Sequence, residues 1–307
     1  MRRSLLLIFS LLAVFTLLLA ATASVEAAQP GTSFMNVKQA HTQKPHRTSN
    51  LFSHGGAIEQ TPKVYIVYWG KEWASGFSTG GYTSAQAQSY VEAFFGAVGG
   101  SGWANSTTQY CQGVPSGTVT CNPGSVHPLN GGGQLAGTWT DNSALPSSIT
   151  QSGIANEASK LAAQFGGVDL QADYMVLTPT GHSQSGFGTS WCAYHSSSGA
   201  LSYSYIPYEP DAGASCGMNF VNGLKNSFGN GYFDGFSIVA GHEYAETITD
   251  PYPNSGWLDS RGAENADKCA WISSGQGAAS NVGLGSHSFA VQSLWSNANG
   301  GCVITYP

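Results

Sequence analysis

Charged residues are scarce in this sequence. Asp, Glu, Lys and Arg make up only 9% of its 307 residues, whereas about a quarter is usual for soluble domains. The eleven Lys and Arg residues are also outnumbered by seventeen Asp and Glu residues. Because binding to nucleic acid or to an anionic membrane surface needs a basic patch, neither partner is expected.

Long apolar runs are also absent, with one exception near the N-terminus. The run from Leu5 to Ala23 follows Arg2 and Arg3 and is itself followed by small residues. This order is typical of a secretory signal peptide, which we place at residues 1–28. An uncleaved anchor is the alternative, because the run is nearly long enough to span a bilayer. We therefore predict a secreted, extracellular protein that meets a membrane only through its signal segment during export.

The cysteines lack the spacing of a metal site, since no two of them stand two to four residues apart. This argues against a cysteine-rich zinc site. An even number of cysteines in an exported chain indicates disulfides instead. Several pairings are possible, and we expect sequential ones because each closes a local loop. The expected pairs are Cys111–Cys121, Cys192–Cys216 and Cys269–Cys302.

The remaining sequence predicts one domain. Residues 29–53 are polar and show no periodicity, so we expect a flexible leader or a short propeptide there. Residues 54–307 suffice for a single α/β domain with a central sheet and a β-rich C-terminal part. An α+β arrangement is the alternative. Strands are expected at 63–69, 173–178, 203–207, 288–294 and 302–306, helices at 83–98, 147–165 and about 234–250, and a disulfide-closed hairpin at 111–121.

Acidic residues gather around one histidine, since six of the seventeen lie between His242 and Asp267. On the helix expected there, His242 and Glu246 are four residues apart and share a face. The sequence H-E-x-x-E at 242–246 resembles the H-E-x-x-H motif, in which two histidines bind zinc and the glutamate is the base. We therefore expect His242 and Glu246 as metal ligands and Glu243 as the catalytic base.

A third ligand is expected from the acidic group that follows. Zinc peptidases of the thermolysin-like type take it from a Glu on a later helix, with an Asp one turn further on. Glu264 and Asp267 fit this arrangement, with Asp267, Asp250 or Asp259 as supporting residues or alternative ligands. One divalent metal is expected, zinc before others, although two carboxylates with one His favour harder metals. A calcium site made from the four carboxylates at 250, 259, 264 and 267 would only hold a loop.

Other residues offer weaker alternatives. Residues 180–186 resemble the G-x-S-x-G nucleophile elbow of α/β-hydrolases, with Ser183 as nucleophile, Asp259 or Asp234 as acid and His287 as base. His54 and His195 are expected to be hydrogen-bonded structural residues, although either could supply a further nitrogen ligand. The eight Trp and fourteen Tyr residues are expected mainly in the core, and a sugar-binding groove is the alternative.

Four short patterns add a family resemblance. They are His54-Gly55-Gly56, Tyr68-Trp69-Gly70, Trp191-Cys192 with His195, and Thr249-Asp250-Pro251 leading to Glu264 and Cys269. Together they resemble the EXORDIUM-like, phosphate-induced protein family, which comprises secreted, cell-wall-associated proteins of plants and bacterial relatives. The stretch 242–271 is similar to bacterial secreted proteins that carry the same H-E-x-x-E. The resemblance implies export and a single domain, and the family's growth-related role is not carried over.

These patterns favour a secreted, zinc-dependent, peptidase-like hydrolase that acts on polypeptides. The alternative from another class is a non-catalytic extracellular or cell-wall protein, with a glycan as its partner and an acidic cluster that binds calcium or only supports the fold. A serine hydrolase that uses Ser183 is the third possibility.

Overall fold

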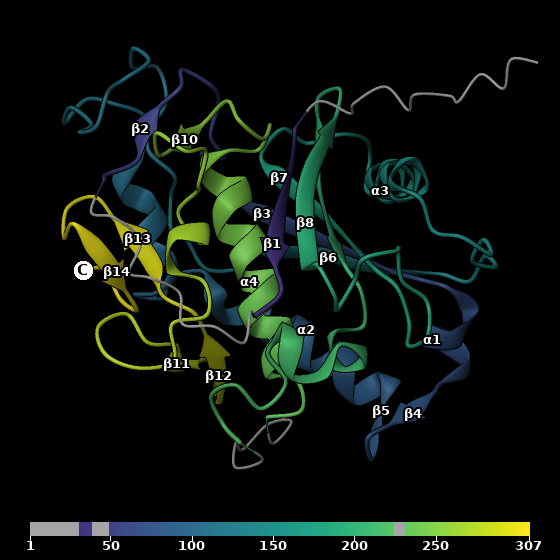
Figure 1. The fold of residues 1–307 in the computed structure, drawn as a ribbon. Helices are drawn as coiled ribbons and strands as arrows, with labels where there is room; N and C mark the ends of the chain where they lie inside the picture. The colour runs from purple at the N-terminus through teal and green to yellow at the C-terminus, as the bar shows by residue number, and fades with distance from the viewer. Residues whose placement is uncertain (1–30, 39–48, 224–230) are drawn as a thin grey trace, which may run out of the picture.

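The computed structural model describes residues 31–38, 49–223 and 231–307, so the predicted signal peptide lies outside the described residues. The chain forms a mixed α/β domain around a six-stranded sheet (Figure 1), which confirms the predicted fold class. Four neighbouring strands are parallel, and β8 runs antiparallel to both of its neighbours, β1 and β9. In spatial order the strands are β1 (Thr32–Asn36), β8 (Trp191–Ser198), β9 (Leu201–Ile206), β7 (Ala172–Leu177), β3 (Lys63–Trp69) and β6 (Leu135–Asp141).

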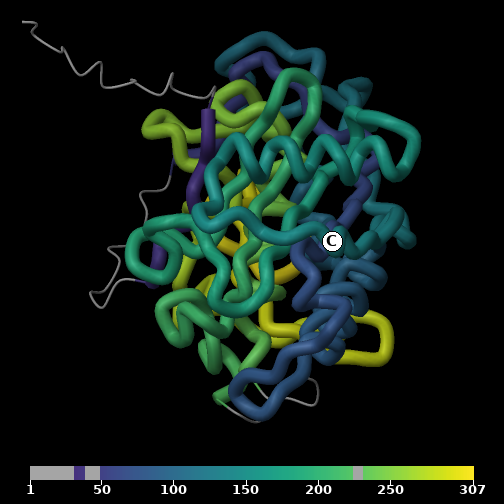
Figure 2. The backbone as a smooth tube through the Cα atoms, turned by 90° about the vertical axis from the view of Figure 1, so that its right-hand side faces the viewer, coloured from purple at the N-terminus to yellow at the C-terminus, as the bar shows by residue number. Residues whose placement is uncertain are grey.

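Helices cover both faces of the sheet. Helix α3 (Gln151–Gln164) packs on one face against β3, β7 and β9, and Figure 2 shows it crossing the near side of the sheet. Helices α2 (Ser84–Val98) and α4 (Asp234–Thr249) belong to the larger core on the opposite face. Side chains alternate between the two cores along β3, because successive strand residues point to opposite faces.

Helix starts follow the capping residues. The Thr83 side chain accepts a hydrogen bond from the Gln86 backbone N–H and forms a capping box, so α2 begins one residue later than expected. The Thr150 side chain likewise caps α3, which begins at Gln151 and not at residue 147. Helix α4 has the bounds predicted from the sequence, and Asp250 follows as its C-cap. No helix of the described residues is long and apolar enough to cross a bilayer.

The C-terminal part is rich in strands, as predicted. Two hairpins follow α4, and β12 packs against that helix on the side away from the sheet. The strand expected at 288–294 is divided into β12 and β13, and the strand expected at 302–306 ends at Val303. The remaining strands and helices are α1 (Lys71–Ser75), β4 (Ser78–Thr79), β5 (Tyr82–Thr83), β10 (Trp257–Leu258), β11 (Ser280–Leu284), β12 (His287–Val291), β13 (Leu294–Ser296), β14 (Gly301–Val303) and the 3₁₀-helices η1 (Ala104–Gln109), η2 (Glu209–Asp211), η3 (Gly213–Cys216) and η4 (Asp267–Cys269).

All three predicted disulfides are present and join Cys111 to Cys121, Cys192 to Cys216 and Cys269 to Cys302. They are consistent with an extracellular protein. The prediction of a hairpin at 111–121 is wrong, because this segment forms turns and its two halves do not pair as strands. Its backbone bonds to residues far away in sequence, since Ser53 donates to the Thr118 carbonyl and accepts from the Gly117 N–H.

Residues 29–53, expected to be a flexible leader or a short propeptide, contribute two strands, so a flexible leader is incorrect for the part that the structure describes. Strand β1 is the edge strand of the sheet and pairs with β8, and β2 (Phe52–Ser53) pairs with β10. The side chain of Met35 is buried in the larger core. The five residues of β1, T-S-F-M-N, show no detectable periodicity, and their pairing depends on β8, about 160 residues further along the chain.

Candidate metal centre

Helix α4 carries the H-E-x-x-E sequence through the middle of the domain, and all sixteen of its residues are buried. Small residues let it pack closely on every side. A Cβ atom at Gly241 would lie 3.2 Å from the Trp103 ring and 3.3 Å from the Phe94 ring, so glycine permits this approach. The polar face of α4 meets β8 of the sheet and the segment between β10 and η4. The motif is therefore part of the interior and not an exposed polar helix face.

The first cluster on this face, the His242 group, consists of His242, Glu246 and Asp267. The Nε2 atom of His242 lies 3.1 Å from Glu246 Oε1 and 3.6 Å from Asp267 Oδ1. Asn265 fastens the Asp267 segment to α4 by donating to the Ala245 carbonyl and the Thr249 hydroxyl. The Asp267 backbone N–H also donates to Glu246 Oε1 at 2.9 Å.

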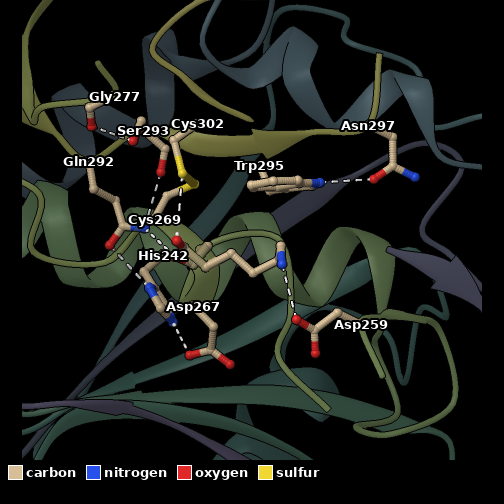
Figure 3. Close-up of a disulfide and its surroundings, with 12 residues drawn as sticks. His242, Asp259, Asp267, Cys269, Gly277, Gln292, Ser293, Trp295, Asn297 and Cys302 are labelled. Carbon is tan, nitrogen blue, oxygen red and sulfur yellow. Dashed lines mark hydrogen bonds and ion pairs between the residues drawn. A yellow bond between two sulfur atoms is a disulfide. The ribbon is translucent and has the colours of Figure 1, made fainter. Parts of the chain in front are cut away.

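Gln292, which follows β12, fixes the orientation of the His242 ring. Its amide nitrogen donates to the carbonyls of Ala266 and Ser293, so its Oε1 faces His242 Nδ1 at 3.1 Å and accepts a hydrogen bond (Figure 3). Nδ1 is then the ring nitrogen that donates to Gln292, and Nε2 is the one that faces Glu246 and Asp267. A lone pair that faces two carboxylate oxygens is unfavourable unless a cation or a second ring proton lies between them.

The second cluster, the His195 group, consists of His195, Glu243 and Glu246. His195 Nδ1 lies 3.2 Å from Glu243 Oε2 and 3.6 Å from Glu246 Oε2. On the other side of the ring, Nε2 lies 3.4 Å from Glu264 Oε1. Burial alone would lower the pKa of His195, but Glu264, Glu243 and Glu246 outweigh it and hold that pKa well above its usual value. Both ring nitrogens therefore face carboxylates.

From the sequence, His195 was expected to be a hydrogen-bonded structural residue that could supply a further nitrogen ligand, and the structure brings it into the centre. It lies on β8 opposite Ser204 of β9, whereas the adjacent pair Tyr194 and Tyr205 packs with α3. The period of two along β8 thus directs His195 to the face that α4 covers. Because β8 reads W-C-A-Y-H-S-S-S, with three serines after His195, the sequence around His195 carries no alternation that could have identified it.

The acidic residues predicted as ligands divide between the two clusters. Asp267, expected mainly as support, faces His242, whereas Glu264, expected as the third ligand, faces His195. Burial raises the pKa of Asp267 to about 6, with a further contribution from Glu264 and an opposing one from His242. Burial, and then the neighbouring Asp267, Glu264 and Glu243 carboxylates, raise the pKa of Glu246 well above its usual value.

Asp250 and Asp259 serve the surrounding loops. The Asp250 carboxylate accepts hydrogen bonds from the backbone N–H groups of residues 254–256 and thereby ends α4. Asp259 pairs with Lys268 at 3.0 Å and accepts from the Arg261 and Ala263 N–H groups. Neither belongs to a group of described residues that could hold a metal, so the all-oxygen calcium site gains no support.

Ser183 lies in the loop after β7 and lines a separate cavity of about 530 Å³ with Thr180 and Asp211. The acids considered for it are engaged elsewhere. Asp234 accepts hydrogen bonds from Val221 and Asn222, and Asp259 pairs with Lys268. The serine hydrolase alternative therefore gains no geometric support.

The remaining residues considered from the sequence lie outside the two clusters. His54 is exposed and stacks on Phe52. No Trp or Tyr side chain is among the exposed large apolar ones of the described residues, which agrees with their expected place in the core. A third group that could hold a metal contains Cys192 and Cys216. Because these two form a disulfide, their sulfur atoms are not available as ligands.

The polar atoms of the centre lack partners to an unusual degree. Within the described residues, five buried atoms there form no hydrogen bond: His195 Nε2, His242 Nε2, Glu243 Oε1, Glu246 Oε2 and Glu264 Oε1. Leaving such atoms unpaired costs about 1–3 kcal/mol each. The residues fit a metal. Two ligand atoms of a tetrahedral zinc, each about 2.0–2.1 Å from the ion, lie about 3.3 Å apart. In the two groups, the distances from histidine nitrogen to carboxylate oxygen are 3.1 to 3.6 Å.

Access to the centre is through Asp267. Its side chain is 25% exposed, whereas those of the other five acidic and histidine residues are 0–1% exposed. Asp267 lines a cavity of about 260 Å³, together with Arg261, Trp271, Asn36 of β1 and the small residues Gly262, Ala263 and Ala270. Asp267 is therefore the residue of the His242 group that this cavity meets.

Comparisons of the chain with known protein families, with curated proteins and with solved structures find no match. The resemblance to the EXORDIUM-like family accordingly stays a prediction.

Proposed function

We propose that this protein is a secreted, metal-dependent hydrolase that cleaves polypeptides, with zinc as its ion. The observation that carries this proposal is the Nε2 atom of His242, which is buried, forms no hydrogen bond and faces Glu246 and Asp267. The His242 group supplies one nitrogen and two carboxylate ligands, which are ligand types that zinc binds, while the second carboxylate shifts the preference towards harder metals. When bound, zinc polarises a carbonyl group and lowers the pKa of water towards neutrality.

Glu243 is the proposed proton acceptor. It occupies the position of the base in the H-E-x-x-H motif, and its Oε1 atom is buried without a hydrogen-bond partner. Its Oε2 atom lies 3.2 Å from His195 Nδ1, which fixes the carboxylate in place. A carboxylate held in this way can take a proton from an attacking water and pass it to the leaving amine.

The opening at Asp267 bears on the substrate. The cavity there is lined by the aromatic ring of Trp271 and the cation of Arg261. Both lie beside Asp267, the one residue of the His242 group that is partly exposed. Arg261 forms no ion pair with a described residue, so its guanidinium is available to a carboxylate of a substrate. A peptide with a carboxylate close to the bond that is cleaved fits this opening.

The near-complete burial of the centre favours a second candidate, a structural metal site in a non-catalytic extracellular protein. Five of the six side chains are 0–1% exposed, as in sites that only hold a fold together. The two candidates differ in what Glu243 does. In a hydrolase the carboxylate is required for turnover, and in a structural site its replacement by an amide affects only stability.

The test is a peptide-library digestion by the purified protein, with and without a chelator, beside His242→Ala. We expect cleavage that is lost with the chelator, restored by zinc and absent from the variant. A protein that contains metal but cleaves no peptide, before or after removal of the residues up to 30, would refute the hydrolase and support the structural site.

A further inference from the structure

We propose that the candidate metal centre binds two divalent cations, one in the His242 group and one in the His195 group. Glu246 belongs to both groups and would bridge the two ions. This inference rests on the proposed function, because it takes the first ion as given and adds a second at residues that the H-E-x-x-E pattern does not identify.

The two oxygens of Glu246 point to different histidines. Oε1 lies 3.1 Å from His242 Nε2, and Oε2 lies 3.6 Å from His195 Nδ1. Oε2 is buried and forms no hydrogen bond. A carboxylate whose two oxygens each face a separate histidine nitrogen is placed to bind one ion on each side. Two-metal hydrolases use such paired ions to hold both the attacking and the leaving group.

In each of the two histidines, one ring nitrogen faces its metal-binding group and the other faces a side chain that can accept its proton. His242 presents Nε2 to its group while Gln292 accepts the proton of Nδ1. His195 presents Nδ1 to its group while Nε2 faces the Glu264 carboxylate. A histidine that binds a metal typically donates its other N–H to a carboxylate or carbonyl, which fixes the ring and raises its basicity. Glu264 therefore has the place of a supporting residue behind His195, the counterpart of Gln292 behind His242.

The charge of the centre also favours a second ion. Four carboxylates meet there, and no Lys or Arg of the described residues forms an ion pair with any of them. The nearest lysine in sequence, Lys268, pairs with Asp259 instead. Buried charges are costly unless they are paired or bind a metal. One divalent ion offsets two of the four negative charges, and a second offsets the other two.

Glu243 has a double task in this arrangement. Its Oε2 atom, which faces His195, would bind the second ion, while Oε1 stays free to accept a proton. The two roles are compatible because a carboxylate has two oxygens with separate lone pairs.

The experiment counts metal ions per chain. The full secreted protein is stripped with a chelator, saturated with zinc, freed of excess ion by gel filtration and measured by elemental mass spectrometry. The same is done for His195→Ala, for His242→Ala and for His54→Ala, an exposed histidine that serves as the control. We expect two ions per chain in the wild type and the control, and one in each of the other two variants.

The outcomes separate this inference from the proposed function. One ion in the wild type, lost in His242→Ala and kept in His195→Ala, would overturn the second site and leave the first intact. No bound ion at all would overturn both. Because a buried variant can fail to fold, the wild type is also loaded with Mn²⁺ and examined by electron paramagnetic resonance. Two ions that share Glu246 are expected to give a spin-coupled spectrum, and the spectrum of isolated Mn²⁺ would contradict the bridge.

Discussion

The amide oxygen of Gln292 lies 3.1 Å from Nδ1 of His242, and this contact decides which ring nitrogen faces the carboxylates. Gln292 cannot turn round without placing its oxygen against the carbonyls of Ala266 and Ser293, to which its nitrogen donates. The orientation of one amide thereby keeps Nε2 of His242 directed at Glu246 and Asp267. Gln292 is 50 residues away from His242 in sequence.

Replacing Gln292 by Leu removes this support while keeping a side chain of similar size. We expect zinc affinity to fall about 10- to 100-fold, the usual effect of losing a residue that orients a ligand. Competition with a chromophoric chelator measures the affinity. The control is Gln276→Leu at an exposed position. Unchanged affinity in Gln292→Leu would show that the contact does not orient His242.

Replacing Glu243 by Gln removes the proposed proton acceptor with little change in shape. We expect peptide turnover to fall by about 10²- to 10⁴-fold, the range for loss of a general base. The thermal unfolding temperature of the zinc-loaded protein should change far less than turnover, because the amide oxygen of Gln can still face the second ion. Assays of kcat and of thermal unfolding on one preparation distinguish the two effects. Full turnover by the variant would exclude Glu243 as the base.

Replacing Arg261 by Ala tests the role of the cavity at Asp267. Arg261 is exposed and lines this cavity, so the variant should fold and bind zinc normally. We expect KM to rise about tenfold for peptides with a carboxylate beside the cleaved bond, because a charge-assisted hydrogen bond contributes about 1.5–3 kcal/mol. Matched peptides that carry Gln in place of Glu should show little change. An equal effect on both peptides would contradict carboxylate recognition.

Stability should decline between pH 4.5 and 7 because of Glu157 on α3. Burial, with a contribution from Asp141, raises the pKa of this carboxyl to about 7, although Lys160 acts in the opposite direction. A carboxyl with a raised pKa in the folded state adds stability below its unfolded value of about 4.5, and this is lost as the pH rises through 7. Glu157→Gln should remove this part of the pH dependence, which amounts to at most about 3 kcal/mol.

Urea unfolding of the wild type and Glu157→Gln at several pH values between 4 and 8 measures this effect. The metal centre titrates in both proteins, so only the difference between them reports on Glu157. Parallel curves for the two proteins would rule out the assigned pKa.

Replacing Met35 by Ala tests whether β1 belongs to the fold. The Met35 side chain is fully buried in the larger core. A cavity left by such a truncation costs about 2–5 kcal/mol, whereas a residue in a flexible leader would contribute nothing. Denaturant unfolding gives the free energy, and the partly exposed Phe34 of the same strand supplies the control as Phe34→Ala. An unchanged free energy of unfolding for Met35→Ala would place β1 outside the cooperative fold.

Much of the fold follows from local patterns. Three features depend on residues within a few positions of one another. They are the bounds of α4, the buried strands β3 and β7, and the position of His242 and Glu246 on one face of α4. The disulfides were predictable for a similar reason, because each closes a loop of 10 to 33 residues. Local spacing is reliable for such features since helix and strand geometry fix which neighbours share a face.

Relations between distant segments were decided by the tertiary structure. The sequence by itself determined an acidic helix with a histidine, but the alignment of β8 on β9 placed His195 beside Glu243, and the turn before η4 gave Asp267 and Glu264 to different histidines. Strand register and the packing of α4 determine these contacts. Neither can be recognised from a periodic pattern in the sequence around each residue. The sequence thus determined that carboxylates would meet a histidine, and the tertiary structure decided which histidines and carboxylates face one another.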